Sequence, residues 1–549
     1  MKKYICNIVS KTLLKSFKQL RLIISCVILA LVFAFTHIIG SNLNCDSYTI
    51  TAFTIPILKF IILFCVFFLI FAFIFILLSK IQPTKRQLSN KFFIFVFFGL
   101  LIIYLIMLYS VYPGIFGYDA PHQIWQVENN QIKNNQPVIS SLIMYTFFNF
   151  GRLVGGTWEA GVFTYLLIQI FSVSFLFTYT TYLCNKHTKN FVISISIFLF
   201  FALFPVNQLF VINCAKDVFY SYIFLCVVII FGEQLLFKNK PFNTMQIILS
   251  IIILLLFLFY RNNSIYILIP FVFATLIVFQ NARKKLLIIF STTIAIYLVI
   301  IGPVYSFFNY NSDNTKEMLA IPEQQIAYAY INNKNSFNEE EINMFKNIFP
   351  YKNDQQFSEL YRPTNSDNIR VQLNIDKYSN GISYFLSNWM SIGIKNIKNY
   401  IIAFLNNTRG YWCFNYTLSN EGSDRYIEYM NSTYPNGIHA SRNSQIPLLE
   451  KNYIEPISKM TNFRLTNLSN IFAIAAPFWL LTILIMYSIY KKNYKLLILL
   501  ILPIMMYITL FAGPLPLLRY VYPISVCIPY LYSLAITTLT ESKPSVHLR

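Results

Sequence analysis

The chain has 549 residues, of which 56% are hydrophobic and 12% are charged, and its formal net charge is +21. Soluble domains average about 25% charged residues, so this composition excludes a soluble globular protein and indicates an integral membrane protein. The positive charge does not indicate a nucleic-acid-binding protein, because the lysines lie in short clusters between apolar runs, a pattern that sets topology in membrane proteins.

Twelve apolar runs predict transmembrane helices, which need about 17–25 residues to cross a bilayer. They lie near residues 22–40, 53–79, 92–110, 160–183, 190–205, 216–236, 246–260, 263–280, 285–303, 468–490, 495–512 and 517–538. Several of the runs between 190 and 280 are short for a full crossing.

Lysine and arginine clusters occur in every second connection, from Lys2 and Lys3 near the start to Lys491 and Lys492 near the end. Because such clusters stay in the cytoplasm, we expect both termini to be cytoplasmic. The heavy use of Lys, Asn and Ile is typical of an AT-rich bacterial genome. We therefore expect a multi-pass protein of the bacterial plasma membrane.

Two segments interrupt this alternation, and both are expected on the outer side. Residues 111–159 are long for a loop, and Gln136 to Gly151 within them are apolar but too short to span. This predicts a helix lying along the outer interface. Residues 304–467 have the composition of a soluble domain and include an amphipathic stretch, Tyr384 to Leu405, that could pack against the membrane.

The expected architecture is an all-α polytopic membrane protein of four parts. They are an N-terminal cytoplasmic segment with two accessory transmembrane helices (1–91), a transmembrane core with the outer loop (92–303), a mainly helical extracytoplasmic domain (304–467), and three transmembrane helices with a short cytoplasmic tail (468–549).

Charged residues gather where the predicted helices meet the outer interface. They are Asp119, Lys216, Asp217, Arg261 and Arg519. Guanidinium groups bind phosphate bidentately. A pair of carboxylates can hold a divalent metal such as Mg or Mn, or can take a proton from an acceptor hydroxyl. This combination is suited to a lipid phosphate that stays in the bilayer while its head group reacts outside.

Each of these residues also has a purely structural interpretation. The two arginines can extend to lipid head groups. The Lys-Asp pair can be a local ion pair, or its Asp a favourable charge at a helix N-terminus. Asp119 is followed by Ala-Pro and can cap a helix that starts near Pro121. His122 can be a ligand, a proton shuttle or an ordinary hydrogen-bonding side chain.

The order of these features resembles the GT-C superfamily of integral-membrane glycosyltransferases. The resemblance rests on an acid-bearing outer loop, a helix introduced by Gln136-Pro137, a second outer loop ending in an acid, and Arg519-Tyr-Val-Tyr-Pro523, which is similar to a late Arg-Tyr-x-x-Pro motif. It covers residues 92–303 best. The chain is also similar to uncharacterised polytopic proteins of Gram-positive bacteria that share Gly-Tyr-Asp, Lys-Asp and the Gly410-Tyr-Trp412 region.

The sequence departs from the GT-C pattern in two respects. The common His-Pro-Pro is Gln136-Pro-Val here, and two additional spans precede the core. Whether such an enzyme needs a metal is not set by the resemblance.

The resemblance implies that Asp119 binds or deprotonates the acceptor, and that Asp217 assists or shares a metal with it. Lys216, Arg261 and Arg519 would contact the lipid phosphate. The implied accessory residues are Tyr118, His122, Arg409 and Trp412. The implied reaction moves a sugar from a polyprenyl-phosphate donor to an envelope glycan, lipid or protein acceptor on the outer face. Direct attack would invert the anomeric centre.

Three other functions compete with this one. A transporter or flippase of lipid-linked sugars would place ionisable residues at mid-membrane, often in two related halves; the only ionisable residue well inside a predicted span is Lys59. An envelope polysaccharide ligase or polymerase would also use interfacial arginines. A non-catalytic scaffold would not need carboxylates and arginines at one depth.

Overall fold

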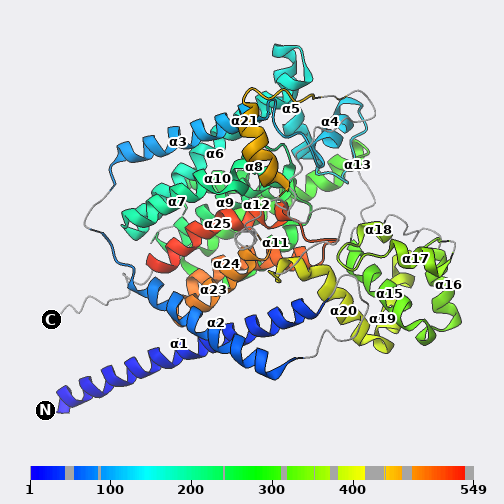
Figure 1. The fold of residues 1–549 in the computed structure, drawn as a ribbon. Coiled ribbons are helices and arrows are strands. Elements are labelled where there is room, and N and C mark those ends of the chain that lie inside the picture. Colours follow the sequence, from blue (N-terminus) through cyan, green and yellow to red (C-terminus); the bar gives the residue numbers. More distant parts are fainter. Residues whose placement is uncertain are drawn as a thin grey trace.

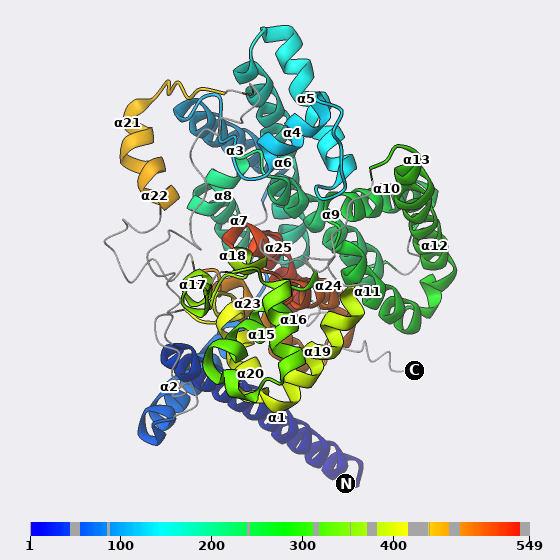
Figure 2. The ribbon, with the colours of Figure 1, turned by 90° about the vertical axis from the view of Figure 1, so that its right-hand side faces the viewer.

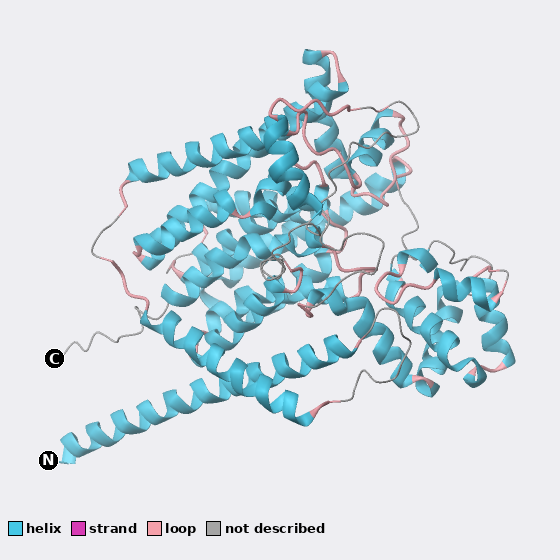
Figure 3. Cartoon of the chain, in the orientation of Figure 1, coloured by secondary structure: helices cyan, strands magenta, loops and turns pink. Residues whose placement is uncertain are grey.

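The computed structural model describes residues 2–43, 55–84, 88–238, 242–310, 318–351, 353–370, 381–414, 438, 440–459 and 473–537. The regular structure of these residues is helical, with two isolated β-bridges (Figures 1 and 3). The all-α polytopic class is therefore confirmed. Parts of the predicted 304–467 segment, namely 311–317, 352, 371–380, 415–437, 439 and 460–467, lie outside the described residues.

The apolar runs form helices because a helix satisfies every backbone N–H and C=O internally, as an apolar surrounding requires. The bundle contains α1 (Lys2–Asn42), α2 (Ile57–Lys80), α3 (Asn90–Ser110), α6 (Trp158–Thr188), α7 (Phe191–Leu203), α8 (Pro205–Val211), α9 (Lys216–Leu236), α10 (Thr244–Tyr260), α11 (Ser264–Val278), α12 (Arg283–Val299), α23 (Ala476–Tyr490), α24 (Tyr494–Phe511) and α25 (Leu518–Thr537).

In the described part of the chain, 9 helices are long and apolar enough to cross a membrane, or 10 if the bent pair α7 and α8 counts as one span. Each of the twelve predicted apolar runs overlaps a helix of the bundle. However, α10, α11 and α23 are shorter than a typical span. The number of twelve crossings therefore stays a prediction.

Helix α9 forms the centre of the bundle. Within its most apolar window 83% of the residues are buried, against 11% for α2 at the periphery. It packs against α6, α10, α24 and α25. The central position of α9 determines where its two ends lie, and its first two residues are Lys216 and Asp217.

The predicted outer loop contains two further helices, α4 (Ala120–Glu128) and α5 (Val138–Gly155). Gln123 of α4 donates hydrogen bonds to the hydroxyls of Ser140 and Ser141 at 3.2 and 2.9 Å, and Arg152 of α5 pairs with Glu128 at 2.8 Å. The expected helix over 136–151 is therefore present. It is also long and apolar enough to span, so its location along the interface stays a prediction.

The described part of segment 304–467 is helical. Its main unit, here called the helical domain, contains α15 (Ala320–Asn333), α16 (Glu339–Ile348), α17 (Asp354–Leu360), α18 (Asp367–Arg370), α19 (Gly381–Lys395) and α20 (Ile397–Thr408). Its core is aromatic: the rings of Tyr330 and Phe345 stack at 3.9 Å, and Phe357 packs on both. Figure 1 shows this domain and α4 and α5 at the same end of the bundle, on the right-hand side; Figure 2 shows that end from the front.

Candidate functional site

Two connections that are distant in sequence meet at one end of the bundle. A parallel bridge joins Ile115 to Asn213: the Ile115 amide donates to the Ile212 carbonyl at 2.9 Å, and the Cys214 amide donates to the Ile115 carbonyl at 3.0 Å. One connection leads to Asp119 and the other to Lys216. The bridge therefore brings the two predicted acid-bearing loops together through their backbones.

A buried side chain and a glycine in a close turn stabilise this junction. The amide of Gln169, on α6, donates to the carbonyls of Val211 and Asn213 at 2.8 and 3.0 Å. Gly114 has a φ of +127°, and a Cβ there would lie 2.0 Å from the Leu166 side chain. Only glycine fits this close turn, since it has no side chain and tolerates a positive φ.

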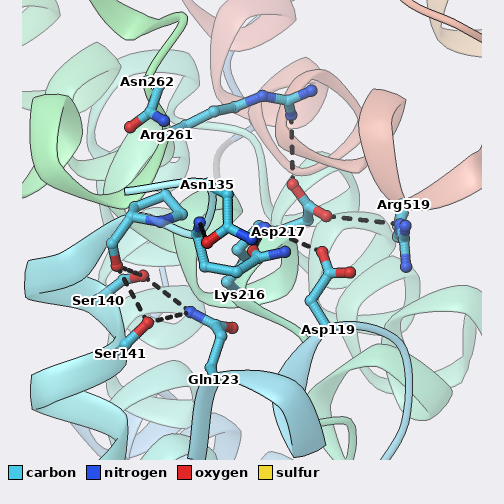
Figure 4. A network of polar contacts seen from close by, with 12 residues as sticks. Asp119, Gln123, Asn135, Ser140, Ser141, Lys216, Asp217, Arg261, Asn262 and Arg519 are labelled. Carbon is cyan, nitrogen blue, oxygen red and sulfur yellow. Dashed lines mark hydrogen bonds and ion pairs between the residues drawn. The ribbon is translucent and has the colours of Figure 1, made fainter. Parts of the chain in front are cut away.

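Asp119 forms an ion pair with Lys216, with 2.9 Å between the Asp119 Oδ2 and the lysine Nζ (Figure 4). Asp119 does occupy the position before α4, as the capping interpretation predicts, but its side chain accepts no capping hydrogen bond. Gln136 contacts the same ammonium through its Oε1. The carboxylate is therefore directed towards α9 rather than towards its own helix.

Asp217 lies between two arginines that come from different parts of the chain (Figure 4). Arg261, in the turn after α10, places its Nη1 3.5 Å from Oδ1, and Arg519, in the first turn of α25, places its Nε 3.5 Å from Oδ2. Asp217 also lies in the first turn of α9, where a negative charge is favourable. The ion pairs of Lys216 and Asp217 thus join separate elements.

Tyrosine rings hold both guanidinium groups. The Arg519 guanidinium lies 4.1 Å from the ring centre of Tyr118 and 5.2 Å from that of Tyr520. Arg261 lies over Tyr520 at 5.1 Å and over Tyr220 at 5.7 Å. Tyr118 has a φ of +55°, which is uncommon for a residue with a side chain. This backbone conformation places its ring at Arg519.

The five charged side chains differ in how accessible they are. The Asp119 side chain is 33% exposed, whereas that of Asp217 is 5% exposed. Three buried guanidinium nitrogens form no hydrogen bond within the part of the chain that the structure describes: Nη1 of Arg261 and Nε of Arg519, which face Asp217 only in ion pairs at 3.5 Å, and Nη1 of Arg519. Buried donors without a hydrogen bond are costly, so these groups can still donate to a further acceptor.

The surrounding charges set the protonation of the loop residues. Burial raises the pKa of Asp119, but the Lys216 ammonium and the Arg519 guanidinium outweigh it and hold that pKa well below its usual range. Burial lowers the pKa of His122, although Asp119 acts in the opposite direction. Near neutral pH, Asp119 is therefore an anion and His122 is mostly uncharged.

A family described as "Family of unknown function (DUF6020)" matches residues 111–547. The chain belongs to this family. Its matched region begins directly after α3 and contains all five charged residues of the cluster. Searches of curated proteins and of solved structures give no match.

Of the accessory residues suggested by the sequence, Tyr118 and His122 lie at the cluster. Trp412 lies elsewhere, against the end of α1: a Cβ at Gly40 would be 3.1 Å from its ring, and its carbonyl accepts a bond from Trp479 at 2.8 Å. Arg409 is 7% exposed in the turn after α20, where its carbonyl accepts the Cys413 amide at 2.9 Å.

Sequence reasoning missed three residues. From the sequence, Gln136 introduces a helix and departs from the His-Pro-Pro motif, but its contact with Lys216 is not predicted. Tyr520 follows Arg519 and lies between the two arginines. Tyr411 is buried close enough to Arg261 and Asp217 to interact with both charges. The Arg-Tyr and Gly-Tyr-Trp motifs contain the two tyrosines, but nothing in the sequence indicates that these rings lie beside the charged cluster.

The two carboxylates do not form a metal site. Within the described residues, no group of three His, Cys, Asp or Glu side chains comes together. Asp119 faces an ammonium and Asp217 faces two guanidinium groups, and these cations would repel Mg or Mn. The donor set therefore does not fit the divalent metal that the sequence allows.

Proposed function

We propose that this protein is a membrane glycosyltransferase of the GT-C type, which moves a sugar from a polyprenyl-phosphate donor to an acceptor hydroxyl at the outer face of the membrane. The observation that supports this most directly is the set of buried, unbonded guanidinium donors next to one partly exposed carboxylate. The guanidinium groups are suited to bind a phosphate leaving group, and the carboxylate is suited to take a proton from an acceptor hydroxyl.

The phosphate is bound by Arg261 and Arg519. Their N–H groups that make no hydrogen bond in the described structure donate to its oxygens, while Asp217 holds both guanidinium groups at 3.5 Å and the tyrosine rings keep them in place before the ligand arrives. Lys216 adds a third positive charge at the same end of α9. With three cations and two carboxylates, the empty cluster carries an excess positive charge that an anionic phosphate neutralises.

The two carboxylates have separate roles. Asp217, which is almost inaccessible, positions the two arginines and does not reach the acceptor. Asp119 is the general base. Its pKa is low while Lys216 and Arg519 act on it alone. A bound phosphate shares those cations, so the pKa of Asp119 rises and the carboxylate becomes a better base when donor is present.

The reaction is a single displacement. The acceptor oxygen forms a bond to the anomeric carbon, the bond from that carbon to the phosphate oxygen breaks, and the polyprenyl phosphate leaves with the electron pair. The acceptor proton passes to Asp119. Attack from the side opposite the leaving group inverts the anomeric centre, and no nucleotide or metal is consumed.

The lipid part of the donor fits an apolar cavity along α9. This cavity of about 510 Å³ is lined by α6, α9 and α10, from Phe219 and Leu256 to Glu233. Phe219 follows Asp217 within one turn, so the cavity begins beside the charged cluster. The 15 residues from Phe219 to Glu233 extend over about 21 Å, long enough for several isoprene units.

The same cavity favours a second candidate, a transporter of lipid-linked sugars. It extends from the charged cluster to Glu233 near the other end of α9, so a polar head group would meet charged residues at both ends. The transferase is preferred because the unbonded donors and the accessible acid occur together at one end only.

The test compares Asp119→Asn with Asp354→Asn in a strain that lacks the gene, at equal amounts of membrane protein. Asp354 also pairs with a lysine, Lys334, but lies in the helical domain, so it is a matched control. Surface-glycan composition and the pool of sugar-linked polyprenyl lipids are measured. We expect Asp119→Asn to lose one surface sugar and accumulate its lipid-linked form, and Asp354→Asn to behave as wild type.

Membrane-impermeant periodate added to intact cells then distinguishes the two candidates. A transferase defect leaves the lipid-linked sugar in the outer leaflet, where periodate oxidises it. A transport defect leaves it inside and protected. Full complementation by Asp119→Asn would remove the main support for the transferase.

A further inference from the structure

The helical domain carries an apolar stripe on its surface. Along α19 and α20 the exposed large side chains are Ile382, Leu386, Met390, Ile394, Ile397 and Ile401. Their spacing of three or four residues places them on one side of the helices. Ile394 is 72% exposed, and Met390 and Ile397 are each 61% exposed. Contiguous apolar surface of this kind marks an interaction site.

The opposite side of the same helices packs inside the helical domain. Phe385 and Ile392 are buried, the Trp389 indole donates to Gln325 on α15 at 2.9 Å, and Tyr400 on α20 donates to the Trp389 carbonyl at 2.8 Å. The stripe is therefore not required for packing of the domain. The exposed apolar side chains therefore indicate an interaction outside the domain.

The polar neighbours of the stripe have an interfacial pattern. Ser383, Ser387 and Ser391 are exposed one residue after successive members of the stripe, and Lys395 and Lys398 follow Ile394 and Ile397 directly. Five of the six apolar positions thus have a small or basic residue directly after them. Lys395 and Ser391 bind Glu341 of α16 at 2.8 Å, so the lysine of this pattern that can extend to lipid head groups is Lys398.

The stripe is continuous with the membrane-spanning bundle. Helix α20 leads into residues that pack on the ends of α1 and α24: Cys413 lies so close to Gly40 that a Cβ there would be 2.5 Å from its Sγ, and the rings of Phe404 and Phe511 lie 6.5 Å apart. Ile401 precedes Thr408, the last residue of α20, by only two turns. Figures 1 and 2 both place α20 next to the end of α1.

We propose that α19 and α20 lie on the membrane leaflet at the site end of the bundle, with the isoleucine stripe in its acyl region. The partner is the lipid surface itself. A protein partner is less suited, because the stripe begins where the lipid-facing helices end. This docking does not depend on the proposed transferase activity.

The test uses the full-length protein in vesicles of phosphatidylethanolamine and phosphatidylglycerol. The photoreactive residue p-benzoylphenylalanine replaces Ile394 in one variant and Met390 in a second. In the control it replaces Glu340, which is exposed in the first turn of α16 in the same domain. After irradiation, intact-protein mass spectrometry measures covalent lipid adducts.

We expect lipid adducts at 394 and 390 to exceed those at 340 by at least about tenfold, since interfacial apolar positions contact acyl chains. The variant at 390 serves if the one at 394 fails to fold. Equal adduct yields at 394, 390 and 340 would overturn the proposal. So would crosslinking of 394 and 390 to another polypeptide, whether a second copy or a different protein, in place of lipid.

Discussion

The two ends of α9 both carry charged clusters, but the clusters are built differently. Near its last turn, Glu233 accepts a hydrogen bond from the Tyr530 hydroxyl at 2.9 Å, contacts His187 closely, and lies 3.5 Å from the Lys186 ammonium. Both of its oxygens have partners. At the first turn, the arginines that face Asp217 keep three nitrogens without a hydrogen bond.

This difference suggests different roles for the two clusters: one stabilises the packing of helices, and the other is the proposed binding site. A buried network in which every member has a partner stabilises one packing, here of α6, α9 and α25. The cluster at the first turn is held by ion pairs at 3.5 Å and by tyrosine rings, and its nitrogens without a hydrogen bond are the donors to which we assign the proposed phosphate. Charge and burial alone do not distinguish the two ends; within the described residues, the buried nitrogens that lack a hydrogen bond do.

The largest effect should come from the arginine of α25. Arg519→Ala removes a buried phosphate donor and should lower kcat/KM for sugar transfer by about 10²–10³, comparable to the loss of one electrostatic donor in other enzymes. Arg519→Lys keeps the charge but loses the planar group between Tyr118 and Tyr520, so it should restore only part of the activity. A transfer assay with purified lipid donor measures both. Wild-type rates for Arg519→Ala would contradict the phosphate role.

The opposite cluster should respond in stability. Glu233→Ala leaves His187 and Tyr530 without their acceptor and should destabilise the protein by about 3 kcal/mol. Thermal unfolding in detergent, compared with Asp119→Asn, gives the measurement. Asp119→Asn should change the melting temperature much less, because Asp119 is partly exposed. Equal losses for both variants would mean that the two ends of α9 do not differ in this way.

A third carboxylate provides a further contrast, because it is buried and accepts no hydrogen bond within the described residues. Both oxygens of Glu323, on α15, lack a hydrogen bond in the described structure, and burial raises its pKa to about 9. Its pKa is higher in the folded state than the unfolded value of 4.5, so stability is full below 4.5 and falls as pH rises towards 9.

Glu323→Gln should remove this dependence. The variant should gain about 2 kcal/mol over wild type between pH 6 and pH 7.5, at roughly 1.4 kcal/mol for each pH unit. Melting temperatures of both proteins across this range provide the check. A difference that stays constant with pH would show that Glu323 is already ionised in the folded protein.

The smallest effect concerns Tyr118. Tyr118→Ala removes one ring from Arg519 and should cost about 1 kcal/mol, or about fivefold in kcat/KM, while Tyr118→Phe should retain the wild-type rate. Donor concentration series separate KM from kcat, and the loss should appear mainly in KM. A loss in Tyr118→Phe equal to that in Tyr118→Ala would instead assign a role to the hydroxyl.

The sequence predicted the helices and the charged residues better than their pairing. Apolar runs identify helices because their length and composition are local properties. The pairing of Asp119 with Lys216 is not local: it follows from the Ile115–Asn213 bridge, in a loop with no strand pattern. The proximity of Lys216 and Asp217 in sequence even suggested a local pair, whereas consecutive residues of a helix point in different directions.

Other parts of the site could not have been predicted from composition. Tyr118 adopts a left-handed backbone that its residue type disfavours, and Gln136 has its role only because α5 starts beside α9. These features depend on tertiary contacts, which a single sequence does not record. The interfacial location predicted for α5, and the sidedness of the termini, stay predictions.

The loop before Arg519 has a consequence for inhibitor discovery. Its carbonyls accept bonds from the helical domain: Gly513 from Asn407 at 2.9 Å, and Pro514 from the Ser366 amide at 3.0 Å. An antibody or cyclic peptide that shifts the helical domain would therefore strain this loop and displace the arginine. Such an agent would act through the helical domain, without competing with lipid at the charged cluster.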